Sequence, residues 1–133
     1  MATEIKGRKI SKGEAKGEVL LSAQPISFYG GVDPDTGVVT EKGHPLEGKS
    51  IKDKVLVFPQ GKGSTVGSYA LYRMKKQGTA PKAIINKECE TIVAVGAIIS
   101  EIPMLDKLEQ DPFTILKDGQ VVTVKATEGK LVI

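Results

Sequence analysis

The feature that most constrains the fold is a strand–helix–strand unit in the middle of the chain. Residues 55–58 are a continuous apolar run, which is typical of a strand buried on both faces. After a glycine-rich segment, residues 66–77 carry apolar side chains at three- and four-residue spacing, which predicts a helix that stops at Gly78. Residues 82–86 form the next apolar strand. The chain therefore contains a β–α–β unit.

Short strands and turns are predicted on both sides of this unit. Residues 4–10 and 18–22 have the glycine-punctuated pattern of β-hairpins. Residues 120–126 alternate in polarity, and turns at Asp118-Gly119 and Glu128-Gly129 precede a last strand at residues 130–133.

Residues 91–100 are ambiguous, because β-branched side chains favour a strand whereas Ala94, Gly96 and Ala97 favour a helix packed closely on a sheet. We expect a helix, followed by a short strand near residues 102–105. The predicted fold class is mixed α/β, with β-hairpins, a β-α-β-α-β core and helices on one side of two strand layers. We expect one domain over residues 1–133.

Composition excludes several classes of protein. The chain has 133 residues, which suits one domain, and no run of about 18 apolar residues that could span a membrane. Its net charge is +3, without a block of five like charges, and it has six aromatic residues, so nucleic-acid binding is not expected. The N-terminus lacks the apolar region of a signal peptide, so we expect a cytoplasmic protein.

The chain has one cysteine and one histidine. Cys89 alone excludes an internal disulfide and a cysteine metal cage, so no metal site is predicted in this chain. Acidic residues flank Cys89 and would not lower its pKa, so we interpret it as an ordinary buried thiol. His44, in a loop, is interpreted as structural rather than catalytic.

The strongest candidate site is the glycine-rich segment between the first strand and the helix of the β–α–β unit. Glycines allow a ligand close to the backbone, and a helix N-terminus attracts anions. We predict that the anion-binding edge is formed by Gly61, Lys62, Gly63 and Thr65. The segment matches neither a P-loop nor a dinucleotide-binding motif, because its glycines are misplaced for both.

Ser64 lies within this segment and has two interpretations. It is either the N-cap of the helix or a nucleophile or base whose alkoxide is stabilised by nearby N–H donors. No histidine or acid lies near it in sequence, so its chemistry would need another chain. Arg73, further along the helix, is a weaker candidate for the same site.

Two further segments are candidate interface or site loops. Residues 29–37 are dense in turn formers and predict an exposed loop that includes Gly30, Gly31 and Asp33, either functional or a simple hairpin tip. Asn86 and Glu88 follow a buried strand, at a strand end where ligand-binding loops gather.

Four motifs occur in this order: YGGVDPxTG at 29–37, GKGSTxGS at 61–68, IINxE at 84–88 and AIISxIP at 97–103. Together they resemble the small subunit of the aconitase X family, in particular its archaeal members. The resemblance covers nearly the whole chain.

This resemblance implies a swivelling β/β/α domain that pairs, as a heterodimer, with a large subunit carrying a 4Fe-4S iron–sulfur cluster. It implies dehydration of (R)-5-phosphomevalonate, a phosphorylated hydroxy acid, to trans-anhydromevalonate 5-phosphate in an archaeal mevalonate pathway. The cluster would act on the leaving hydroxyl, and Ser64 would be the proton acceptor. No cofactor is expected on this chain, since one cysteine cannot hold a cluster.

Two alternatives remain from the sequence. One is a dehydratase subunit of the same type that acts on another hydroxy acid, such as a hydroxyproline. The other is a non-enzymatic module that binds an anion or a partner.

Overall fold

The structure is a computed structural model that describes residues 3–62 and 66–133. The helices in this part of the chain are α1 (Phe28–Gly31), α2 (Gly67–Gln77), α3 (Thr91–Ile99) and α4 (Pro112–Ile115), and a 3-10 turn spans Ala126–Glu128. The strands are β1 (Glu4–Lys6), β2 (Arg8–Ser11), β3 (Glu14–Leu21), β4 (Val55–Phe58), β5 (Ala83–Asn86), β6 (Met104–Asp106), β7 (Val121–Lys125) and β8 (Lys130–Val132). They join in the order β1-β8-β7-β3-β4-β5-β6-β2.

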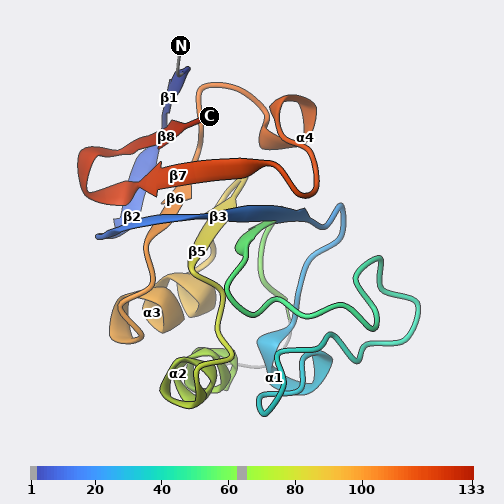
Figure 1. The fold of residues 1–133 in the computed structure, drawn as a ribbon. Helices are drawn as coiled ribbons and strands as arrows, with labels where there is room; N and C mark the ends of the chain where they lie inside the picture. The colour runs from blue at the N-terminus through green and yellow to red at the C-terminus, as the bar shows by residue number, and fades with distance from the viewer. Residues whose placement is uncertain (1–2, 63–65) are drawn as a thin grey trace.

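The strands form two layers that share β3. Its first residues, from Glu14 to Glu18, pair antiparallel with β7, and its last, from Val19 to Leu21, pair parallel with β4. β1, β8 and β7 continue the antiparallel layer, whereas β4, β5 and β6 are parallel. Figure 1 shows the antiparallel layer above the parallel strands, with α2 and α3 below. This β/β/α arrangement confirms the predicted fold class.

The parallel strands β4 and β5 are buried at every residue. Leu56 and Ile84 face a helix-side core with α2 and α3, whereas Val57 and Ile85 face a sheet-side core between the two strand layers. This alternation is the two-residue period of a strand with apolar neighbours on both faces. The prediction that residues 55–58 and 82–86 are buried strands is confirmed.

The two predicted long helices are also confirmed. α2 ends at Gly78, whose φ of +78° is left-handed and whose N–H bonds to the carbonyls of Met74 and Lys75. α3 packs closely against α2 at Gly96. A Cβ at this position would lie only 3.2 Å from the Cα of Ser68, so the close approach requires glycine. The small residue therefore serves a close helix–helix contact rather than the expected helix–sheet contact.

The predicted hairpins at the N-terminus are wrong. Residues 4–10 form two strands that separate at Gly7, because β1 pairs with β8 and β2 pairs with β6. A Cβ at Gly7 would lie 2.6 Å from Leu108 Cδ2 and 3.0 Å from the carbonyl oxygen of Asp106. β3 begins at Glu14, before the predicted strand at residues 18–22, and its first part pairs with β7. The chain thus crosses at Gly7 from the layer that contains β1 to the layer that contains β2.

The C-terminal prediction is confirmed in part. β7 and β8 form the expected hairpin, which turns through the 3-10 segment and Gly129. The turn at Asp118-Gly119 instead follows α4, a short helix that the sequence pattern did not predict. Asp111 caps α4 by accepting the N–H of Phe113, and proline occupies its first turn.

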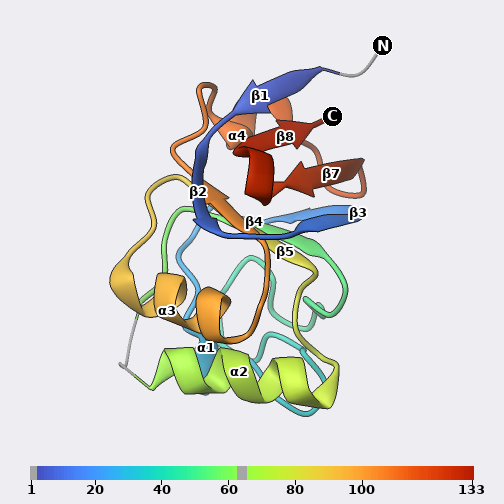
Figure 2. The ribbon, with the colours of Figure 1, turned by 90° about the vertical axis from the view of Figure 1, so that its left-hand side faces the viewer.

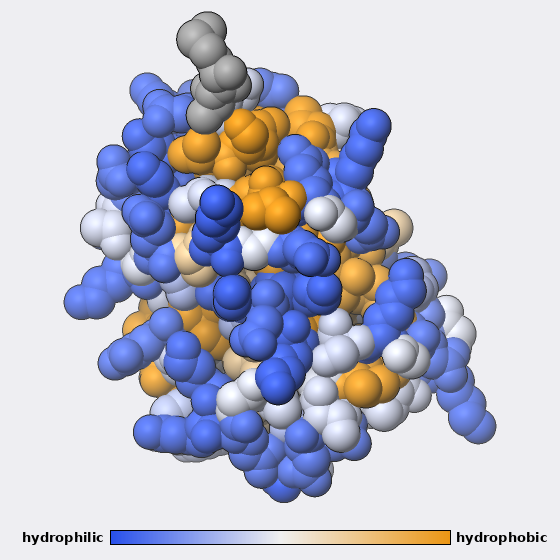
Figure 3. All heavy atoms as spheres, viewed as in Figure 1, coloured by the Kyte–Doolittle hydropathy of each residue, from blue (hydrophilic) through white to orange (hydrophobic). Residues whose placement is uncertain are grey.

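The polarity of the outer surface is uneven. Figure 3 shows the face of Figure 1, which is mostly hydrophilic, with an apolar area near the chain ends and α4. Phe113, Ile115 and Ile133 are partly buried against the sheet-side core. No helix of the described residues is long and apolar enough to cross a membrane.

We expect Gly7→Ala to lower the free energy of unfolding by about 1–3 kcal/mol, because the methyl group overpacks the passage between the layers. Gly17→Ala is the matched control, since its Cβ would meet no atom closer than 3.4 Å. That variant should stay within about 0.5 kcal/mol of the wild type. Urea unfolding of both variants measures the difference, and equal midpoints would contradict the role given to Gly7.

Candidate functional site

The carboxyl ends of β4 and β5 form one edge of the parallel layer. The backbone N–H groups of Lys87 and Glu88 donate to the carbonyl of Pro59, at 3.1 and 3.4 Å. Residues 59–62 and 86–88 therefore lie together, as the strand-end prediction for Asn86 and Glu88 requires. We refer to these two segments as the strand-end edge. Ligands of open α/β sheets bind at such edges.

Gly61 fits only as a glycine at this edge. An added Cβ would collide with Val93 and would lie 2.8 Å from Glu90 Oε1. Ile26 pairs with both sides of Gly61, since its N–H donates to Gln60 O (3.3 Å) and its carbonyl accepts from Lys62 N (3.0 Å). Ile26 thus fixes the backbone on both sides of Gly61, at the start of the glycine-rich segment.

Gly63, Ser64 and Thr65, which carry the predicted catalytic and anion-binding roles, lie outside the described residues. The description resumes at Val66, which occupies the N-cap position of α2 and has no side-chain cap hydrogen bond. The interpretation of Ser64 as an N-cap also falls outside the described residues. The proposed chemistry of Ser64 stays a prediction.

Lys62 is held by an ion pair that the sequence did not predict. Its Nζ lies 2.8 Å from Glu41 Oε2, with both side chains partly exposed. Glu41 also packs beside Gly31, and Thr40 N donates to the Gly31 carbonyl at 2.9 Å. Glu41 thus connects the 29–37 segment to the strand-end edge. Nothing local in the sequence distinguished Glu41 from other acidic loop residues.

Asn86 places an amide inside the strand-end edge. The side chain is fully buried, and its Nδ2 donates to the carbonyl of Phe58 at 3.0 Å. Its Oδ1 is buried and has no hydrogen-bond partner among the described residues. A buried amide oxygen of this kind costs free energy unless a further donor reaches it.

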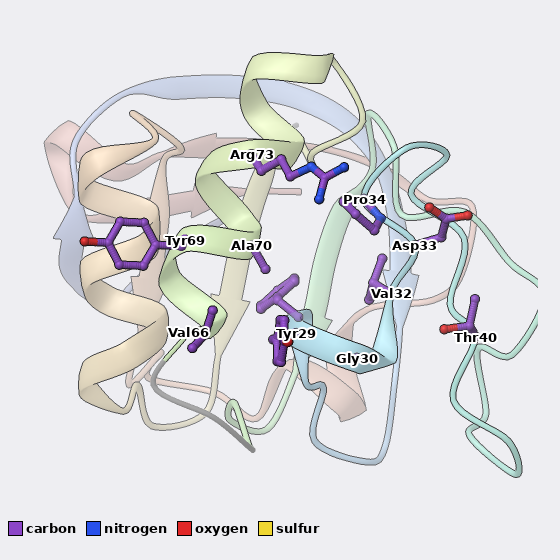
Figure 4. A pocket seen from close by; sticks show the side chains of 11 residues that line it. Tyr29, Gly30, Val32, Asp33, Pro34, Thr40, Val66, Tyr69, Ala70 and Arg73 are labelled. Carbon is purple, nitrogen blue, oxygen red and sulfur yellow. The ribbon is translucent and has the colours of Figure 1, made fainter.

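A groove of about 510 Å³ lies between α2 and the 29–37 segment (Figure 4). Its walls are mainly apolar and aromatic, and Arg73 closes one end; the lining residues are Phe28, Tyr29, Gly30, Val32, Asp33, Pro34, Thr40, Val66, Tyr69, Ala70 and Arg73. Arg73 Nη2 makes a long ion pair of 3.4 Å with Asp35. The groove therefore combines apolar surface with one guanidinium group.

The 29–37 segment is only partly the exposed loop that was predicted. Phe28 and Val32 point into the helix-side core, whereas Tyr29 and Gly30 are exposed. Gly30 has a φ of +86°, which favours glycine, and Asp33 Oδ1 accepts the N–H of Asp35. Two buried anchors therefore hold an exposed turn beside α2.

Comparison with known proteins identifies the family. A family model described as the aconitase X swivel domain matches residues 4–133. The chain belongs to the aconitase X swivel-domain family. The resemblance found in the sequence motifs is thereby confirmed.

Relatives and solved structures of the family agree over nearly the full length. The chain is 65% identical to the phosphomevalonate dehydratase small subunit of Methanosarcina acetivorans, over 95% of this chain and 88% of the relative. It is 56% identical to the protein of that name from Thermococcus kodakarensis, over 96% and 94%. The crystal structure of Thermococcus kodakaraensis aconitase X in its holo-form superposes with a TM-score of 0.92, at 54% identity and 98% coverage of both chains.

In this aconitase X swivel domain, His44 has the structural role that the sequence predicted. Its Nδ1 accepts the N–H of Leu46 at 3.0 Å, so the ring proton sits on Nε2, 3.0 Å from the carbonyl of Pro25. His44 therefore connects two loop segments. It is buried and does not line the groove beside α2.

Cys89 is half-buried, and we expect its thiol to react slowly with electrophiles. Burial raises the pKa of its thiol to about 11, and the carboxylates of Asp106 and Glu90 add to the shift. Its Sγ donates to the carbonyl of Glu90 at 3.2 Å. Within residues 3–62 and 66–133, no group of three His, Cys, Asp or Glu side chains could hold a metal ion.

We expect iodoacetamide to alkylate Cys89 at pH 8 on the order of 100-fold more slowly in the folded chain than in the urea-unfolded chain. The raised pKa leaves the folded thiol almost fully protonated, and only the thiolate reacts. The alkylation rate should rise as the pH approaches 11. Mass spectrometry of timed samples measures both rates, and similar rates at pH 8 would refute the assignment.

Proposed function

We propose that this chain is the small subunit of a hydro-lyase that dehydrates (R)-5-phosphomevalonate to trans-anhydromevalonate 5-phosphate in the mevalonate pathway. The observation that carries the proposal is the 65% identity over 95% of the chain to a phosphomevalonate dehydratase small subunit. Relatives of the same name from Thermococcus are 52–58% identical. The strand-end edge, with Gly61 and Lys62, suits an anionic substrate.

In this proposal Ser64 takes a proton from the carbon next to the one that bears the leaving hydroxyl. The C–H bond breaks and its electron pair forms the carbon–carbon double bond, while the C–O bond breaks and its electron pair leaves with the hydroxyl as hydroxide. This hydroxide and the proton taken up by Ser64 together make up the one water that is lost. A serine is a useful base only when its alkoxide is stabilised electrostatically. Gly61 and Lys62 precede Ser64, and the first turn of α2 follows it, which supports such a site.

The N-terminus of α3 is a poor anion site at this edge. Glu90 caps α3, where its carboxylate accepts the N–H groups of Ile92 and Val93 at 3.2 and 2.8 Å. The first turn of α3 is therefore already neutralised by an acidic side chain. An anionic substrate next to Gly61 would then be bound by groups other than the start of α3.

The iron–sulfur cluster does not fit this chain, and we assign it to a large subunit. The chain has one cysteine, whose raised pKa keeps it protonated, whereas cluster ligands are thiolates. A cluster in the partner would supply a Lewis acid for the leaving hydroxyl. The name "small subunit" of the relatives implies such a partner. We also propose a cytoplasmic heterodimer, in keeping with a free thiol.

We expect Ser64→Ala to abolish dehydration while the two subunits still assemble, because the substitution removes only the proposed proton acceptor. The chain is co-expressed with its candidate large subunit, the cluster is reconstituted anaerobically, and mass spectrometry follows loss of water from (R)-5-phosphomevalonate. Ser50→Ala is the control, since Ser50 bonds to the Thr36 carbonyl away from the strand-end edge. Full activity of the Ser64 variant would refute its role.

The same assay separates the alternatives. Turnover of (R)-5-phosphomevalonate that needs both chains supports the proposal. A stable complex that dehydrates a hydroxyproline but not (R)-5-phosphomevalonate would replace the substrate and keep the reaction. A chain that binds phosphate without any dehydratase partner would favour a binding module.

A further inference from the structure

α3 has an outer face that does not suit contact with water. None of its nine residues is charged, and Val95, Ile98 and Ile99 are exposed on the surface. A surface helix normally places charged or polar residues on its outer side, and a helix that is apolar all round is usually buried. Its inner side is already occupied by the contact of Gly96 with α2. The outer side of α3 therefore lacks a partner in the isolated chain.

The apolar surface of α3 continues onto α2 and the groove beside it. The exposed large apolar side chains on α1, α2 and α3, with Val66 just before α2, are Tyr29, Val66, Tyr69, Tyr72, Val95, Ile98 and Ile99, which we call the helix face. They include all three tyrosines of the chain. Tyrosine is enriched in protein interfaces.

The helix face is concentrated on one side of the molecule. Among the described residues, only Val121 on β7 is a large exposed apolar side chain outside it. Figure 2 shows α2 and α3 side by side, on the side away from β7 and β8. Tyr72 and Ile99 line one shallow groove between the two helices. Clustering of this kind marks an interaction surface rather than scattered surface residues.

The charges around the helix face are of both signs, because Glu101 lines the groove shared by Tyr72 and Ile99, and α2 contributes cations. α2 carries Arg73, Lys75 and Lys76 and no acidic residue, and α3 adds no charge. Lys76 Nζ lies 5.3 Å from the centre of the Tyr72 ring, so the cations border the aromatic surface. The face therefore suits a partner surface that is apolar at its centre and carries charged groups at its rim.

We propose that the helix face is the surface on which the large subunit docks. The inference rests on the proposed function, which supplies the partner. Val66, Tyr29 and Tyr69 belong both to the helix face and to the groove beside the strand-end edge. A chain that completes a site at this edge therefore extends over the helix face. Docking and completion of the site occur on one continuous surface.

The test is a matched pair of charge substitutions, Ile98→Glu and Val121→Glu. Both side chains are 54% exposed, so both variants should fold, and circular dichroism melting of each isolated chain checks this. Affinity for the purified large subunit is measured by titration calorimetry. We expect Ile98→Glu to weaken binding at least tenfold and Val121→Glu to change it less than twofold. Tyr69→Ala, which removes a 70% exposed side chain, should also weaken binding.

The readout is binding, so it is independent of turnover. A complex that forms through Ile98 but dehydrates nothing would refute the proposed function and keep the docking surface. Wild-type affinity of Ile98→Glu, or a loss with Val121→Glu alone, would overturn the docking surface. A self-associated chain that becomes monomeric with Ile98→Glu, while large-subunit binding is unchanged, would identify a second copy as the occupant and overturn it too.

Discussion

The rest of the structure depends on the parallel pairing of β4 with β5. Both strands are buried at every residue, and their side chains alternate between the two cores. The pairing therefore fixes the position of the antiparallel layer relative to the helices. It also aligns the ends of the strands, because Phe58 is in register with Asn86. Gly61, Lys62 and Glu88 of the candidate site lie within a few residues of these two ends.

The strand-end edge is held by interactions of very different strength. The hydrogen bonds of Ile26, Pro59 and Asn86 are backbone or buried contacts that keep the edge in place. The ion pair between Lys62 and Glu41 is partly exposed, and such pairs contribute only about 0–1 kcal/mol. In the proposed function, an anionic substrate would therefore displace Glu41 from Lys62 without disturbing the backbone. The backbone of the edge is thus held by hydrogen bonds, whereas the ion pair of Lys62 with Glu41 can be exchanged for another.

The sequence predicted the elements whose determinants are local. The β4–α2–β5 unit follows from apolar spacing and from Gly78, and α3 follows from its small residues. The N-terminal strands were assigned the wrong partners, because β2 pairs with β6 across 98 residues, as the Arg8–Asp106 contact shows. No local pattern reveals such a partner.

The same distinction applies to the candidate site. Gly61 and Asn86 were singled out from the sequence because neighbouring residues identify a glycine-rich turn and the end of a buried strand. Glu41 was not, because its role comes from a contact 21 residues away, with Lys62. The two interpretations of Ser64, as an N-cap and as a base, both stay predictions, because Ser64 lies outside the described residues.

α3 connects the fold to the proposed second chain. Val93 and Ala97 lie in the helix-side core and Gly96 contacts α2, whereas Val95, Ile98 and Ile99 face outward. Burying these three side chains in a complex would contribute about 25 cal/mol for each Å² of apolar surface removed from water. In the proposed complex, that gain would be made on the same surface on which the large subunit completes the site. Assembly would then supply both the missing chemistry and the missing cover of α3.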